Sequence, residues 1–162
     1  MSAPNPLNAY VVMDTIWLGF HLGEAMNVLS WAINRPGLVK ASQIVWRQIN
    51  PETLTENVDA KSWLDHELRE NNLSDTVAFL TSRTVSEFRE QRVERSEFQV
   101  HCVTTVGLGN AERVGQRMMS QGESVGTINI AVATNLGLTE QARLEAMSII
   151  VQARTAAILE QR

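Results

Sequence analysis

Val103-Thr-Thr-Val-Gly-Leu-Gly-Asn-Ala-Glu-Arg-Val-Gly115, followed by Gly126-Thr-Ile-Asn-Ile-Ala-Val132, is the stretch that indicates both a fold and a site. Two apolar runs rich in β-branched residues are joined by a loop that is punctuated by glycines, as expected of strands that end near a ligand. Thr127 and Asn129 share one face of the second run, because side chains alternate along a strand. The stretch therefore predicts a polar site built on strand ends.

The small polar residues of this stretch are the first candidates for ligand contact. Thr104 and Thr105 face opposite sides of their strand, so only one can face a site, and the functional hypothesis puts Thr105 beside Asn110. Asn110 could bind a ligand amide or donate to a developing oxyanion, or it could be an ordinary loop residue. Asn129 in mid-strand needs either a structural partner or a ligand, because a buried unpaired amide is costly.

Working outward, β-branched and aromatic residues predict further strands on both sides of this stretch. The strands are expected over 10–20, 25–33, 41–49, 76–81, 98–106 and 127–134, with a loop at 21–24 and a turn at 34–37. The alternating acids and bases of 84–95 favour a solvated helix instead, and 110–121 is expected to hold about one helical turn.

Two further segments carry clear helix signals. Asp59 is expected to cap a helix over 60–70. Thr139 is a good N-cap for a long C-terminal helix, whose alanine-rich stripe indicates close packing against a sheet or another helix. That stripe would also suit a dimer face. The prediction is a single α+β domain over 10–162, with a mainly antiparallel or mixed sheet, helices packed on it, and a flexible lead-in at 1–9.

Composition excludes several classes of function. The net charge is −4, whereas nucleic-acid binders usually present a basic field. Lys40 and Lys61 are the only lysines, so no basic membrane-binding patch is available. The single cysteine, Cys102, rules out an intrachain disulfide and fits a reducing compartment. No secretory signal and no apolar run of about 20 residues is present, so we expect a cytoplasmic protein with no nucleic acid or membrane as partner.

Familiar catalytic motifs are absent. The three histidines are far apart and no Cys-x-x-Cys occurs, so no metal site is expected. Gly107-Leu-Gly109 is not a dinucleotide-binding loop, because Glu112 stands where that loop needs a third glycine or alanine. His101 and Cys102 do not form a dyad, because neighbours on a strand point to opposite faces.

Polar residues in the N-terminal half supply the remaining candidates. Glu24 and Ser30 stand among apolar neighbours. Glu24 could be an ordinary loop residue, or a general base if a pocket raised its pKa. The four tryptophans all lie in the first 63 residues, where they could pack the core or form an aromatic wall around a large flat ligand.

Taken together, these segments resemble the adenosylcobinamide amidohydrolase family. The likeness runs from about Val28 to the C-terminal helix. Its most specific part is Thr104-Thr-Val-Gly-Leu-Gly-Asn-Ala111, then Arg113 and Gly115, Gly126-Thr-Ile-Asn-Ile130, and Leu138-Thr-Glu-x-Ala-x-x-Glu-Ala146. Weaker likenesses lie upstream at Val28-Leu-Ser30, Gly37-Leu38 and Ala78-Phe-Leu-Thr-Ser82.

The resemblance implies hydrolysis of the amide between a propionamide arm of the corrin ring and an aminopropanol group, which yields adenosylcobyric acid for cobamide synthesis. The corrinoid enters as substrate, so no cofactor is expected. Alternatives are a corrinoid-binding protein without hydrolytic activity, an amidase for another small molecule, and an interaction domain whose polar groups satisfy each other.

For an amide hydrolysis, the candidate residues take distinct roles. Thr105 or Ser30 would be the nucleophile or orient water, and Glu24 is the candidate base. The candidate substrate-binding residues are Gly107, Gly109, Arg113, Thr127 and Asn129, and Asn110 joins Asn129 as a binder of the amide and the oxyanion.

Overall fold

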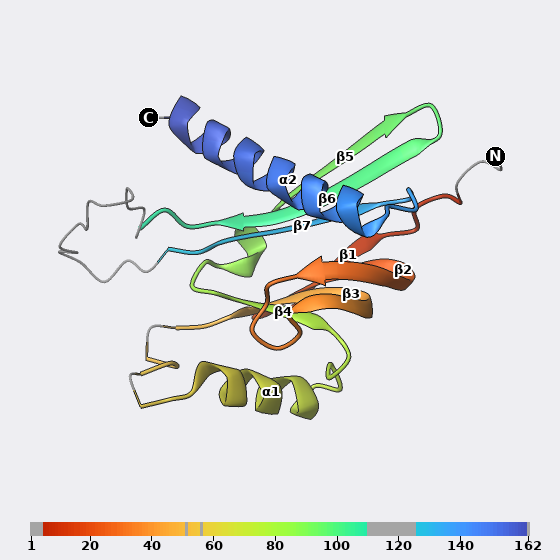
Figure 1. Cartoon of the computed structure of the whole chain (residues 1–162). Helices are drawn as coiled ribbons and strands as arrows, with labels where there is room; N and C mark the ends of the chain where they lie inside the picture. Colours follow the sequence, from red (N-terminus) through yellow and green to blue (C-terminus); the bar gives the residue numbers. More distant parts are fainter. Residues whose placement is uncertain (1–4, 51, 56, 110–125, 162) are drawn as a thin grey trace.

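The computed structural model describes residues 5–50, 52–55, 57–109 and 126–161, which form two β-sheets and two α-helices (Figure 1). The first sheet has the order β1-β2-β3-β4. Its strands are β1 (Tyr10–Met13), β2 (Trp17–Ser30), β3 (Gly37–Gln48) and β4 (Val77–Thr81). All its pairings are antiparallel except the one between β3 and β4, which is parallel. The parallel pair needs a crossover connection, which contains helix α1 (Ala60–Glu70).

The second sheet is antiparallel and has the order β5-β6-β7. Its strands are β5 (Arg89–Arg95), β6 (Phe98–Val106) and β7 (Ile128–Thr134). A short 3-10 helix, η1 (Val85–Glu87), leads from β4 into β5. Helix α2 (Glu140–Glu160) runs alongside β6 and β7 (Figure 1). The α+β class predicted from the sequence is confirmed.

The main core lies between the two sheets. Phe20 and Trp46 contribute to it from the first sheet, and Val103 and Ala131 contribute from the second. The ring of Phe20 meets that of His101 edge to face, with 4.7 Å between centroids. The segment before β1 also joins this core, because Ala9 is buried there. Burial of these apolar side chains is the main force that holds one sheet against the other.

A second, smaller core lies under α1, where Leu64 packs against the outer face of the first sheet. Arg47 borders it, with its guanidinium 5.2 Å and 5.3 Å from the ring centroids of Trp17 and Trp63. The same guanidinium pairs with Glu67 at 2.7 Å. Trp17 and Trp63 therefore pack around one cation.

Both helix predictions are confirmed. Helix α1 spans 60–70, and the carboxylate of Asp59 accepts from the backbone N–H of Ser62 at 2.8 Å. Thr139 caps α2 by accepting from Ala142 N–H at 3.2 Å. The alanine-rich stripe, however, is not closely packed. Helix α2 has no fully buried residue, and Ile149 is 57% exposed. The predicted helical turn at 110–121 lies outside the described residues.

The loop predicted at 21–24 is wrong. Strand β2 continues through these residues and changes register between His21 and Met26. Gly23 has φ +83°, a backbone conformation that glycine adopts without steric cost. The glycine therefore marks a bulge inside a long strand, and the real break between the first two strands falls after Met13.

The helix predicted over 84–95 is also wrong. After η1 the chain forms β5, an edge strand in which every residue is exposed. Because neither face of this strand is covered, it lacks the alternation of apolar and polar residues that identifies a half-buried strand. Its alternating charges therefore resemble those of a solvated helix.

Candidate functional site

A polar cleft of about 310 Å³ opens where the end of β6 faces the segment that joins β4 to β5. Its lining residues are Arg83, Thr84, Glu87, Arg89, Thr104, Thr105 and Val106. Both sides of this polar cleft are fixed by pairing, because β4 is held against β3 and β6 is held between β5 and β7. The cleft therefore stands on two rigid sheets.

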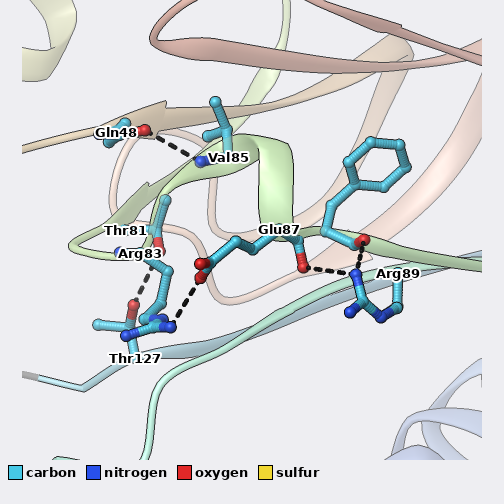
Figure 2. A network of polar contacts seen from close by, with 8 residues as sticks. Gln48, Thr81, Arg83, Val85, Glu87, Arg89 and Thr127 are labelled. Atoms are coloured by element: carbon cyan, nitrogen blue, oxygen red, sulfur yellow. Dashed lines mark hydrogen bonds and ion pairs between the residues drawn. The ribbon is translucent and has the colours of Figure 1, made fainter.

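Hydrogen bonds position the side of the cleft that follows β4 (Figure 2). The buried hydroxyl of Thr81 accepts from the backbone N–H of Arg83 at 3.1 Å and from the hydroxyl of Thr127 at 3.2 Å. The side-chain oxygen of Gln48 accepts from Val85 N–H at 2.9 Å, which anchors η1 to the end of β3. Thr127, predicted as a substrate-binding residue, is thus engaged in holding the two sheets together.

Charged groups of both signs meet in the cleft. Arg83 Nη2 and Glu87 Oε2 lie 2.7 Å apart. Arg89 Nη1 donates to the backbone carbonyls of Glu87 and Phe88 at 3.3 Å and 3.0 Å (Figure 2). A guanidinium carries five N–H donors, so these contacts use only part of the capacity of Arg89. The Glu87 carboxylate therefore lies beside the Arg83 guanidinium, while Arg89 lies on the side of the Glu87 backbone carbonyl (Figure 2).

Thr105 is the unusual residue of the cleft. Its side chain is 2% exposed, and its hydroxyl has no hydrogen-bond partner among the described residues. Most buried polar atoms in native proteins are paired, so an unpaired hydroxyl at the wall of a cleft asks for a functional explanation. Of the two neighbouring threonines, Thr104 instead donates to the carbonyl of Asn129 at 3.0 Å. The Thr105 hydroxyl is thus enclosed and unpaired in the described part of the chain, and its contact with a ligand stays a prediction.

The glycines beside the cleft have a packing role. Gly107 N–H donates to the carbonyl of Thr127 at 2.8 Å. A Cβ at Gly126 would lie 2.5 Å from the backbone nitrogen of Gly109, and one at Gly107 would lie 2.8 Å from Cδ of Arg83. The close approach that these glycines permit is therefore, in the described part of the chain, between segments of the protein itself.

Asn129 was expected to have either a structural partner or a ligand, and the structure gives its side chain a structural partner. Its Nδ2 donates to the carbonyl of Leu80 in β4 at 2.8 Å, which links β7 to the first sheet. Asn129 is also the register partner of Thr105 across the β6–β7 pair. The amide therefore fixes the strand that lies directly beside the unpaired hydroxyl.

A second concave region, the α2 hollow, lies beneath helix α2 and consists of two adjoining cavities of about 330 Å³ and 120 Å³. The residues common to both cavities are Val28, Leu29, Ile44, Val132, Met147 and Ile150. Glu24 lines the larger cavity, and Ser30 and Asn129 line the smaller one. The hydroxyl of Ser30 accepts from Ala32 N–H at 2.9 Å.

The structure thus divides the predicted catalytic residues between two places. Thr105 lines the polar cleft, whereas Glu24 and Ser30 line the α2 hollow. Asn110 and Arg113 lie outside the described residues.

The three charged residues of the polar cleft, Arg83, Glu87 and Arg89, were not among the site residues predicted from the sequence. A signal existed for Arg83, because the polar residues 82–84 directly follow the buried strand β4 and such residues gather at the end of a sheet.

Two titratable side chains of β6 have shifted pKa values. Burial, followed by the nearby charge of Arg92, lowers the pKa of His101, although its Nε2 lies 2.8 Å from Glu90 Oε1. Burial raises the pKa of the Cys102 thiol. Neither residue lines the polar cleft, so these shifts concern stability and the reactivity of the thiol.

Within the described ranges, no group of three or more His, Cys, Asp or Glu side chains is placed to hold a metal ion. No helix in this part of the chain is long and apolar enough to cross a membrane.

Comparison with known proteins identifies a family. The family model described as adenosylcobinamide amidohydrolase matches residues 7–162, and this range includes both the polar cleft and the α2 hollow. Neither a curated protein nor a solved structure matches the chain.

Proposed function

Since the chain belongs to the adenosylcobinamide amidohydrolase family, we propose that it hydrolyses the amide between the corrin propionamide arm and aminopropanol in adenosylcobinamide. The products are adenosylcobyric acid and aminopropanol, and the reaction serves corrinoid salvage. The observation that carries this proposal is the family match, which extends over nearly the whole chain. We further propose that the polar cleft is the catalytic centre.

The contents of the polar cleft support this location. Amide hydrolysis needs a positioned nucleophile, donors for the oxyanion, and a group that delivers a proton to the leaving amine. The cleft offers the unpaired hydroxyl of Thr105, the guanidinium groups of Arg83 and Arg89, and the carboxylate of Glu87. Its volume of about 310 Å³ suits an amide arm rather than a whole corrin ring.

The proposed reaction uses water as nucleophile. When the amide occupies the cleft, the Thr105 hydroxyl, which has no partner among the described residues, binds and orients the water. Glu87 accepts a proton from this water as the oxygen attacks the carbonyl carbon. Arg89 donates to the oxyanion, and Arg83 holds the Glu87 carboxylate through its ion pair. When the C–N bond breaks, Glu87 passes the proton to the nitrogen of aminopropanol, so each group returns to its starting state.

Glu87 thereby takes the acid–base role that the sequence assigned to Glu24. The reason is geometric, because Glu87 lines the same cleft as Thr105 and Glu24 does not. Ser30 is left out of the chemistry for the same reason. Asn110, which follows the glycine pair in sequence, stays a proposed binder of the substrate amide.

The test is incubation of the purified chain with adenosylcobinamide, followed by mass spectrometry of the corrinoid. Loss of aminopropanol is the expected result, and Glu87→Gln should lower kcat by about 10²–10⁴-fold. Glu94→Gln is the matched control, because Glu94 is an exposed carboxylate on β5 away from the cleft and its variant should keep wild-type turnover.

Three other results would each contradict part of the proposal. If corrinoid co-elutes with the protein but stays intact, the chain is a binding protein without hydrolytic activity. If no corrinoid binds, the proposed function is wrong. If Glu87→Gln turns over substrate as fast as Glu94→Gln, the catalytic centre lies elsewhere.

A further inference from the structure

The α2 hollow is not used by the proposed chemistry. Its cavities of about 330 Å³ and 120 Å³ share six lining residues, five of them branched aliphatic and one a methionine. Ligand pockets are usually concave, mainly apolar regions of about 300–1,000 Å³, and the two adjoining cavities together fall in this range. Helix α2 covers it without burying any residue fully.

We propose that the α2 hollow binds the adenosyl group of the substrate, an inference that rests on the proposed function. A purine nucleoside is flat, largely apolar on its faces and polar at its edges, and the hollow has the same distribution. The residues common to both cavities are apolar, while Glu24, Asn27 and Arg143 line the larger cavity and Arg154 lines the smaller one. A corrin ring with its amide arms is too large for a space of this volume.

Trp31 gives the mouth of the hollow a surface for a planar ring. Trp31 lines the smaller cavity, yet 63% of the residue is exposed to solvent. Its ring is therefore largely free for contact with a ligand. Purine bases stack readily on aromatic side chains, and this contact does not require hydrogen bonds to the base. The indole therefore offers one wall of the adenosyl site.

The position of the hollow fits a substrate that reaches both sites at once. Asn129 lines the smaller cavity, and its register partner Thr105 lines the polar cleft. Partner Cα atoms across an antiparallel pair are about 5 Å apart. A corrinoid that sends its amide arm into the cleft could therefore place its axial adenosyl group beside β7.

The experiment compares adenosylcobinamide with dicyanocobinamide, which has the same aminopropanol arm but carries cyanide in place of the adenosyl group. Ala146→Trp fills the hollow from its roof, and Ala156→Trp adds the same bulk to an exposed position of α2 that does not line it. Ala146→Trp should lower the ratio of kcat/KM for the adenosyl over the dicyano substrate about tenfold, and Ala156→Trp should leave it unchanged.

A second variant and a binding measurement keep the inference testable if Ala146→Trp does not fold. Trp31→Ala removes an exposed ring and should lower the same ratio. Calorimetric titration with 5′-deoxyadenosine should show binding to the wild type and to Ala156→Trp, and weaker binding to Ala146→Trp.

Equal effects of Ala146→Trp on both substrates, or no binding of 5′-deoxyadenosine by the wild type, would overturn the inference. If the wild type hydrolyses neither corrinoid, the proposed function has failed, and the titration alone then decides whether the hollow is a nucleoside site.

Discussion

Replacement of Thr105 by valine should make the protein more stable and less active. The hydroxyl of Thr105 is buried and has no partner in the described part of the chain. Leaving a buried hydroxyl unpaired costs about 1–3 kcal/mol, and a methyl group of the same shape does not carry this cost. We therefore expect Thr105→Val to raise the free energy of unfolding by about 1 kcal/mol, which corresponds to about 2–4 °C in Tm for a chain of this size.

Thr81→Val is the control, because it applies the same substitution to a buried threonine whose hydroxyl is paired. Thr81 is equally buried, but its hydroxyl bonds to the Arg83 N–H and to the Thr127 hydroxyl. The same substitution there leaves buried groups unpaired and should lower the free energy of unfolding by about 1–2 kcal/mol. Thermal unfolding followed by circular dichroism measures both variants against the wild type.

Turnover of adenosylcobinamide supplies the second half of the test. Thr105→Val should lower kcat by about 10²-fold, because the water would lose the group that orients it. Destabilisation of Thr105→Val to the same extent as Thr81→Val would mean that the hydroxyl is paired in solution. Normal turnover by a stable Thr105→Val variant would refute the assignment of the polar cleft.

Three other predictions concern stability. Burial lowers the pKa of His101 below its usual 6.5, so the unfolded chain binds more protons in acid than the folded chain does. The urea midpoint of unfolding should therefore fall as the pH drops below about 6.5. His101→Gln should weaken this pH dependence. Gly126→Ala should destabilise the chain by more than about 2 kcal/mol in thermal unfolding, because its Cβ would lie 2.5 Å from backbone, whereas Gly137→Ala, with no atom within 4 Å, should be nearly neutral. Arg47→Met should cost about 2 kcal/mol in urea unfolding, because the guanidinium lies between two indoles, and Lys61→Met, which breaks an exposed ion pair, should cost no more than about 0.5 kcal/mol.

The elements that the sequence predicted well are those whose ends are set by local chemistry. Asp59 and Thr139 each place a side-chain oxygen where the first free N–H groups of a helix need an acceptor. The strand at 98–106 was also predicted with its observed bounds, because its buried and exposed residues alternate. Such signals do not depend on the rest of the fold.

The wrong predictions concern elements whose structure depends on pairing with other parts of the fold. Gly23 could begin a loop or form a bulge, and only the pairing of β2 with β3 decides between them. Of the residues that line the polar cleft, Thr105 was a candidate from the sequence, whereas Glu87 was expected on a solvated surface, where it lies, and was not linked to Thr105. Thr105 and Glu87 come close to each other because of how the two sheets pack, and the spacing of residues along the sequence does not predict that packing.

The exposed edge strand β5 has one further property, which concerns the behaviour of the protein at high concentration. An unpaired strand edge is a template on which a second molecule can add its own strand. If two β5 strands paired antiparallel about Arg92, like charges would face each other at each charged position. The facing pairs would be Arg89 with Arg95, Glu90 with Glu94, and Arg92 with its own copy. Like charges directly opposite each other destabilise a strand pair, so the near-palindromic order of charges disfavours the fully overlapped antiparallel pairing of two β5 strands.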